Sequence, residues 1–340
     1  MDNETQTLEI LEAAARRREE RREFLRTTRG GAMAALGVSL LSACSGGGDD
    51  EPQPAPEPPA PPTPPPPPPP PPGITDADIL NFALNLEYLE AQFYSFAAFG
   101  EGLPQNLLGG TGNQGEARGG RQVNFNDPIV AQHARELAID ERAHVAFLRA
   151  ALGASAVAQP QINISPSSTG AFSAAARAAG LIGPNEAFDP YANDQSFLLA
   201  AFIFEDVGVT AYKGASPLLE SKVFLEAAAG ILAAEAYHAS MIRTTLFQKG
   251  MRIPQLLSAT TAISDARDSL DGPEDKDQGI VRGERNLANI VPANGNGIAF
   301  SRTAGEVLNI VYLTPEQANK GGFFPRGVNG TIMESDDNSG

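Results

Sequence analysis

The stretches Glu141-Arg142-Ala143-His144 and Glu235-Ala236-Tyr237-His238 decide the fold of this chain, and they contain two of its three histidines. On an α-helix, residues i and i+3 share one face, so each stretch aims a carboxylate and an imidazole at one point. Oxygen and nitrogen together form a ligand set that suits iron or manganese. Two such helices facing each other could therefore hold two metal ions between them.

Two further glutamates extend this pattern into an internal repeat. Glu87 is followed by Tyr94, and Glu205 by Tyr212, each at a spacing of seven residues, which is about two helical turns. The chain thus reads Glu-x6-Tyr, Glu-x-x-His, Glu-x6-Tyr, Glu-x-x-His. We interpret this order as two helix pairs that contribute matching ligands to one site.

The segments around these residues have the apolar spacing of helices. Caps and breakers predict their ends, and a long loop over 100–126 and a crossover over 159–190 separate them. Four long helices in two pairs predict an all-α four-helix bundle over 74–250, followed by an irregular extension over 251–340 that packs on the bundle and is disordered in its last ten residues. The expected long helices span 76–99, 127–152, 194–214 and 217–250, with a short one at 171–179.

The order of ligands over residues 76–250 resembles that of the ferritin-like superfamily of carboxylate-bridged dinuclear metal proteins, such as bacterioferritins and rubrerythrins. The resemblance implies a ferritin-like bundle with two iron or manganese ions. It implies Glu87 and Glu205 as terminal ligands, Glu141 and Glu235 as bridging ligands, and His144 and His238 as ligands of one ion each.

The same resemblance implies a supporting role for Asp140, which would orient the histidine of the opposite motif. Ala234 occupies the matching position in the second motif, so His144 is expected to lack that partner. Tyr94 and Tyr212 have two interpretations. They could hydrogen-bond a ligand carboxylate or serve in electron transfer, or they could be core residues with satisfied hydroxyl groups.

Other polar residues near the motifs are expected to stand outside the ligand set. Glu90 shares a face with Glu87, but the spacing to Tyr94 favours Glu87 as the ligand, which leaves Glu90 as a neighbour of the site or a surface charge. Three more residues are expected to be solvated or structural. The helical period makes each of them either point in another direction from the ligands or lie several turns away along the helix. They are Glu136, Asp206 and His133.

Several stretches narrow the resemblance to the desiccation-related branch of the superfamily. The first is Leu84-Asn85-Leu86-Glu87-Tyr88-Leu89-Glu90-Ala91-Gln92-Phe93-Tyr94, which resembles the opening helix of that branch. The later ones are Ile263-Ser264-Asp265-Ala266-Arg267-Asp268, Asn289-Ile290-Val291-Pro292 and Gly321-Gly322-Phe323-Phe324-Pro325.

The start of the chain predicts export. Arg21-Arg22-Glu23-Phe24-Leu25-Arg26 resembles a twin-arginine signal, and Leu41-Ser42-Ala43-Cys44 resembles the lipobox of bacterial lipoproteins. We therefore expect residues 1–44 to be a leader, with Cys44, the only cysteine, carrying a lipid. Residues 45–73 form a Gly- and Pro-rich linker that would act as a semi-rigid stalk. A periplasmic or cell-envelope protein with a lipid anchor is the expected result.

The net charge limits the classes of partner that the chain is expected to bind. The seven arginines of the leader are balanced by seven acidic residues, so the formal charge of −16 belongs to the rest of the chain. No basic stripe is present, which argues against nucleic acid as a partner. The expected partners are metal ions together with dioxygen or peroxide, and the membrane only through the lipid.

Two functions are compatible with these residues. The first is an enzyme whose dinuclear iron or manganese centre oxidises ferrous iron or removes peroxide, with a manganese-catalase-like reaction as a variant. The second is a non-catalytic desiccation or stress protein of the envelope, in which metal is structural or absent.

Overall fold

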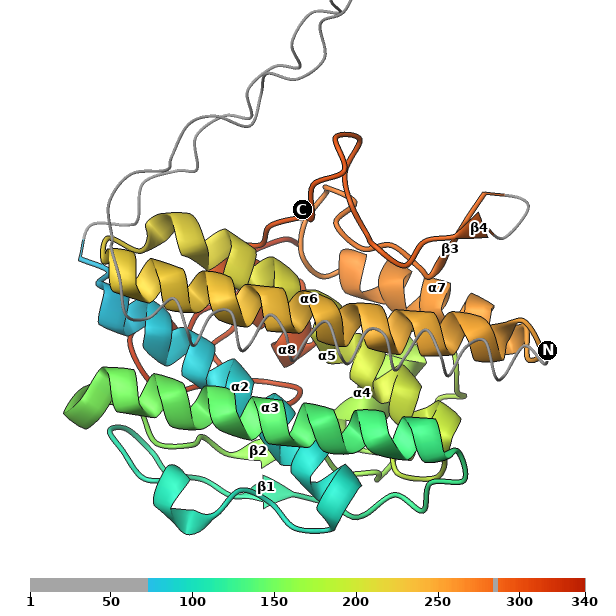
Figure 1. Ribbon diagram of the computed structural model, residues 1–340, viewed down its shortest axis with the longest axis horizontal. Helices are drawn as coiled ribbons and strands as arrows, with labels where there is room; N and C mark the ends of the chain where they lie inside the picture. Colours follow the sequence, from blue (N-terminus) through green and yellow to red (C-terminus); the bar gives the residue numbers. More distant parts are fainter. Residues whose placement is uncertain (1–72, 284–286, 340) are drawn as a thin grey trace, which may run out of the picture. The chain divides into compact units, whose positions relative to one another are not determined.

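The computed structural model describes residues 73–283 and 287–339. The expected leader, the lipidation site Cys44 and the linker up to residue 72 lie outside the described residues. The described body is an all-α bundle, which confirms the predicted fold class (Figure 1). None of its described helices is long and apolar enough to cross a membrane.

Two helix pairs build the bundle. Within each pair the two long helices lie side by side, and the two pairs pack against each other (Figure 1). The first pair is α2 (Asp76–Phe99) with α3 (Pro128–Leu152), and the second is α5 (Asp194–Ala215) with α6 (Lys222–Gly250). Because α2 is covered by α3, by α5 and by the rest of the chain, most of its residues are buried.

Side-chain caps set the starts of the long helices. Thr75 and Asp78 form a reciprocal capping box at the start of α2, and Asp127 caps α3 with Pro128 in its first turn. The predicted start of the fourth long helix at Pro217 is wrong. Residues Ser216–Leu218 form a 3₁₀ turn (η4), and α6 begins only after Ser221, whose side chain caps it.

The loop and the crossover run beside each other. The loop holds the 3₁₀ turn η2 (Gln105–Leu107) and strand β1 (Ala117–Arg118). The crossover holds the 3₁₀ turn η3 (Gly153–Ser155), strand β2 (Ile162–Asn163) and α4 (Ala171–Ala178), the predicted short helix. Strands β1 and β2 pair in parallel, with Ala117 opposite Ile162, so the two connections support each other.

The C-terminal extension packs on α5 and α6, and it contains helices and strands as well as loops. It consists of α7 (Gln255–Asp268), the antiparallel strands β3 (Val281–Arg282) and β4 (Leu287–Ala288), and α8 (Ala304–Tyr312). We expected disorder over the last ten residues, but residues 331–339 are held in place. The Ser335 N–H donates to the Ala318 carbonyl at 2.8 Å, and the Asn338 N–H donates to the Pro315 carbonyl at 2.7 Å.

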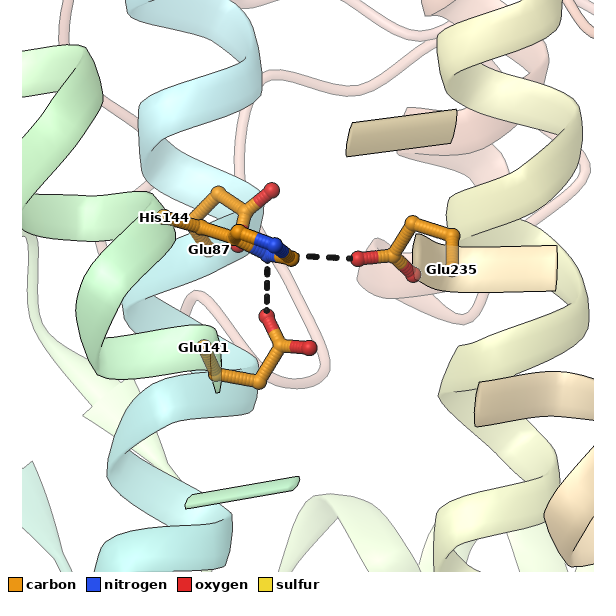
Figure 2. A group of neighbouring side chains, drawn as sticks. All are labelled: Glu87, Glu141, His144 and Glu235. Atoms are coloured by element: carbon orange, nitrogen blue, oxygen red, sulfur yellow. Dashed lines mark hydrogen bonds and ion pairs between the residues drawn. The ribbon is translucent and has the colours of Figure 1, made fainter. Parts of the chain in front are cut away.

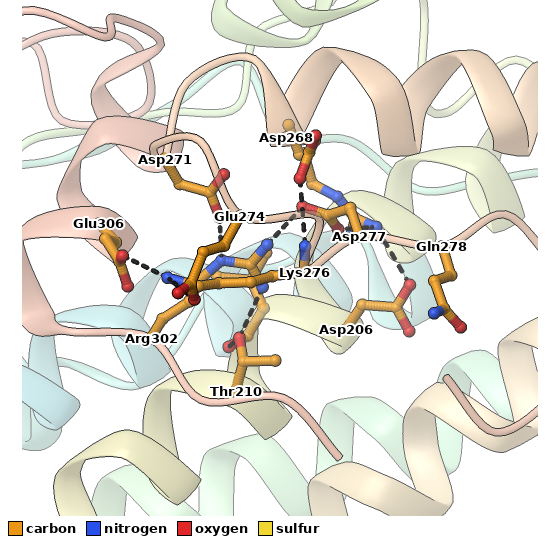
Figure 3. Close-up of polar contacts among 12 residues, drawn as sticks. Asp206, Thr210, Asp268, Asp271, Glu274, Lys276, Asp277, Gln278, Arg302 and Glu306 are labelled. Atoms are coloured by element: carbon orange, nitrogen blue, oxygen red, sulfur yellow. Dashed lines mark hydrogen bonds and ion pairs between the residues drawn. The ribbon is translucent and has the colours of Figure 1, made fainter. Parts of the chain in front are cut away.

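A buried network of charges joins the extension to the bundle (Figure 3). Asp206, which we expected at the surface, is buried and accepts hydrogen bonds from Arg243 Nη1 at 2.7 Å and Arg267 Nη2 at 3.1 Å. Arg302 in turn lies between Asp271 and Asp277. Helical period alone could not place Asp206, because the residues that cover and pair with it come from a part of the chain far away in sequence.

Replacing Asp206 with Asn should lower the free energy of unfolding by about 3 kcal/mol, since two buried arginines would lose their shared carboxylate. The matched control is Asp265→Asn on α7, which removes an exposed carboxylate and should change stability by less than about 0.5 kcal/mol. Denaturant unfolding measures both. Equal stabilities for the two variants would show that the network does not hold the extension to the bundle.

Candidate metal centre

The four long helices bring all six predicted ligands into one buried cluster. Two groups that each contain a histidine offer ligand atoms that lie within 4.8 Å of one another. The two groups share Glu141. The first contains Glu87, Glu141, His144 and Glu235 (Figure 2), and the second contains Glu141, Glu205 and His238.

In the first group, His144 is the central side chain. Its Nδ1 atom lies 3.2 Å from Glu87 Oε2 and 3.3 Å from Glu141 Oε2. Glu235 approaches from α6 on the opposite side, with its Oε1 atom 3.7 Å from the same nitrogen (Figure 2). Three helices thus point carboxylates at one imidazole nitrogen.

In the second group, His238 occupies the corresponding place. Its Nδ1 atom lies 3.0 Å from Glu141 Oε1 and 3.7 Å from Glu205 Oε2. Its other nitrogen, Nε2, lies 3.1 Å from Asp140 Oδ2. Asp140 therefore reaches the histidine of the opposite motif, and the hydrogen bond to Nε2 leaves Nδ1 directed at the cluster. Ala234 offers His144 no such partner.

The two tyrosines contact the cluster in a crossed pattern. The Tyr94 hydroxyl donates a hydrogen bond to Glu205 Oε1, and the Tyr212 hydroxyl donates one to Glu87 Oε1. Each tyrosine therefore fixes the glutamate of the other helix pair. Of the two interpretations of these residues, the geometry favours contact with a candidate ligand over a purely apolar core role.

Burial and mutual charge shift the pKa values of the cluster. Burial raises the pKa of Glu87 to about 7 and that of Glu205 to about 8, and it raises the pKa of Glu235 well above its ordinary value. Burial opposes charge on the histidines too, but the neighbouring carboxylates outweigh it and raise the pKa of His144 to about 11 and that of His238 to about 10.

Glu141 behaves differently from the other carboxylates. Burial favours its neutral form, yet the imidazolium rings of His144 and His238 hold its pKa well below its ordinary value. Without metal, the cluster is therefore a mixture of imidazolium rings, one carboxylate and several neutral carboxylic acids. It is a proton-filled site in which bound cations could take the place of protons.

The donor atoms fit a metal centre. Several buried atoms of the cluster have no hydrogen-bond partner among the described residues, and each such atom costs about 1–3 kcal/mol. His238 Nδ1 and Glu141 Oε1 are both in this set although they are close together, because they are not aligned for a hydrogen bond. The atoms are Glu90 Oε2, Glu141 Oε1, Glu205 Oε2, Glu235 Oε2 and His238 Nδ1. Bound iron or manganese would satisfy such a set of carboxylate and imidazole donors.

Glu90 belongs to this cluster, although the sequence left it as either a neighbour of the site or a surface charge. Its side chain is buried, so the surface interpretation is wrong, and it groups with Glu205 and Glu235. The signal was its i+3 spacing from Glu87, which puts both on one face of α2. Glu136 is exposed, and neither it nor His133 belongs to a ligand group among the described residues.

Fold and site together define a four-helix-bundle protein with a candidate carboxylate–histidine metal centre. The chain belongs to the ferritin-like domain family, whose model matches residues 75–248. It is 31% identical over 272 residues to the ferritin-like catalase Nec2 of Nesocodon mauritianus, covering 76% of this chain and 84% of that protein. No solved structure gives a significant match to this chain.

A second relative confirms the predicted branch of the family. The chain is 31% identical over 271 residues to the desiccation-related protein PCC13-62 of Craterostigma plantagineum, covering 75% of this chain and 83% of that protein. The resemblance to desiccation-related proteins is therefore shown.

The proton load of the cluster predicts how stability depends on pH. The ordinary pKa values are 4.5 for glutamate and 6.5 for histidine. At a pH above these values the unfolded chain releases the protons of Glu87, Glu205 and both histidines, whereas the folded chain keeps them until the pH reaches the raised pKa values. The free energy of unfolding of the metal-free protein should therefore fall by ~3 kcal/mol or more between about pH 5 and about pH 10. Denaturant unfolding across this range measures it.

The control is the same protein loaded with manganese. Metal replaces the protons in the folded state, so the fall with pH should be smaller or reversed. A metal-free protein whose stability rises through the same range would contradict the protonation pattern given above.

Proposed function

We propose that this chain holds two iron or manganese ions in the cluster and acts as an oxidoreductase that removes hydrogen peroxide or oxidises ferrous iron. The observation that carries the proposal is that Glu141 is common to two Glu/His groups, each with an imidazole nitrogen facing carboxylate oxygens. Similarity to a protein named ferritin-like catalase favours peroxide removal of the two reactions.

The chain's own residues would fix the ligands. When bound, two metal ions that change oxidation state would supply the electron transfers by which two peroxide molecules become water and dioxygen. Tyr94 and Tyr212 hold Glu205 and Glu87 in place by hydrogen bonds, and Asp140 orients His238. These contacts keep the donor atoms converged, which a reaction at the centre requires.

The exposure of the cluster favours a small substrate. The side chain of His144 is 13% exposed, whereas the other five predicted ligands are at most 5% exposed. Asp140, which neighbours the cluster on α3, is 43% exposed. This partial exposure on the α3 side would suit a small molecule such as peroxide or a ferrous ion better than a large organic molecule, because the carboxylates of the cluster are buried.

A second candidate function is a non-catalytic role in desiccation or stress, with metal structural or absent. Similarity to a desiccation-related protein motivates it, and so does Ala234, which leaves His144 without the support that Asp140 gives His238. The two candidates differ in turnover, because only the enzyme should consume peroxide or ferrous iron.

We also propose that the protein works at the cell envelope. The twin-arginine pattern and the lipobox at Cys44 support this place. Labelling with radioactive palmitate that is lost in Cys44→Ala would agree with it, and an unlabelled protein recovered in the cytoplasm would contradict it.

The enzyme proposal predicts that the full chain, loaded with manganese or iron, evolves dioxygen from hydrogen peroxide or oxidises ferrous iron. Glu141→Ala should lower the rate at least about 100-fold, because both groups lose their shared ligand. The control is Glu136→Gln on the exposed face of α3, which should keep the wild-type rate. A metal-loaded wild-type protein with no turnover in an oxygen-electrode or iron-oxidation assay would leave the non-catalytic role.

A further inference from the structure

A third group of ligand atoms lies beside the two that contain histidine. Glu90 of α2, Glu205 of α5 and Glu235 of α6 each offer a carboxylate oxygen, and the three oxygens lie within 4.8 Å of one another. Two of these residues also belong to the histidine-containing groups. Glu90 is the member that the dinuclear scheme does not use.

The oxygens of this group are unsatisfied as well as close. Glu90 Oε2, Glu205 Oε2 and Glu235 Oε2 have no hydrogen-bond partner among the described residues. The side chains are 7%, 1% and 1% exposed, respectively. Buried carboxyl groups that converge in this way must share either protons or a cation, because ionised oxygens this crowded repel one another.

A glycine on α5 makes room for the group. A Cβ atom at Gly208 would lie 2.3 Å from Glu235 Oε2, so a side chain there would push this oxygen out of its place, and it would lie 3.6 Å from Glu90 Oε1, in ordinary contact. Glycine inside a helix costs about 1 kcal/mol relative to alanine. At this position in α5 the glycine leaves room for the Glu235 carboxylate.

Charge supports a further cation. Two divalent ions balance four carboxylates, and Glu90 is a fifth in the same buried cluster. No lysine or arginine lies within ion-pair distance of Glu90 among the residues the structure describes. A buried carboxylate without a counterion is costly, so a cation near Glu90 would stabilise the filled site.

We propose that Glu90, Glu205 and Glu235 hold a third divalent cation next to the two positions that contain histidine. This inference rests on the proposed metal centre and extends it. The third position offers only carboxylate oxygen, so it selects a hard ion such as Mn²⁺, whereas the other two positions also offer nitrogen. The third position would share Glu235 with the first position and Glu205 with the second.

The test counts Mn²⁺ bound to the full chain after metal removal by a chelator. Free Mn²⁺ is measured by electron paramagnetic resonance during titration, and bound metal by elemental analysis after dialysis. The wild type should bind three ions, and Glu90→Gln should bind two, because it removes one charge and one oxygen from the third position alone. The matched control, Glu136→Gln, changes an exposed glutamate and should bind three.

The outcomes separate this inference from the proposed function. Two ions in the wild type, or three in Glu90→Gln, would overturn the third position and leave the dinuclear centre standing. No bound ion in the wild type would overturn both. Circular dichroism checks that Glu90→Gln is folded. If it is not, anomalous scattering from a manganese-loaded wild-type crystal decides, by a peak or its absence between Glu90, Glu205 and Glu235.

Discussion

The structure depends on the burial of Glu141 between two histidines. A carboxylate in an apolar bundle needs positive charge around it, and His144 and His238 supply this from α3 and α6. Each imidazole then gathers a further glutamate, from α2 and from α5. Because residues from all four long helices take part, the cluster constrains how the two helix pairs face each other. Protons or metal ions must fill it for the bundle to remain stable.

The remainder of the chain protects this arrangement. Asp206 follows Glu205 directly on α5, and its pairing with Arg243 and Arg267 fixes α5 against α6 and the extension. The described part of the extension thus stabilises the helices that carry ligands and supplies no residue to the groups that contain histidine. This gives a physical reason for the residues after 250, which the sequence predicted as an irregular extension that could include a few short helices or strands.

The sequence predicted the helices and the six convergent side chains because their signals are local. The i+3 spacing of Glu141 and His144, the repeat with Tyr94 and Tyr212, and the caps at Thr75 and Asp127 all act within two turns of one helix. Prediction from the sequence failed where the residues that contact each other are far apart in the chain. Asp206 is buried by the extension, and the crossed bonds from each tyrosine to the opposite glutamate depend on how the helix pairs pack.

The central claim is that the cluster around Glu141 binds metal through both histidines. The most direct test is the metal content of the full chain purified from cells supplied with both iron and manganese, beside the His144→Ala, His238→Ala double variant. Our account predicts at least two iron or manganese ions per wild-type chain and their loss in the folded double variant. A wild-type protein that is folded and free of metal would contradict it.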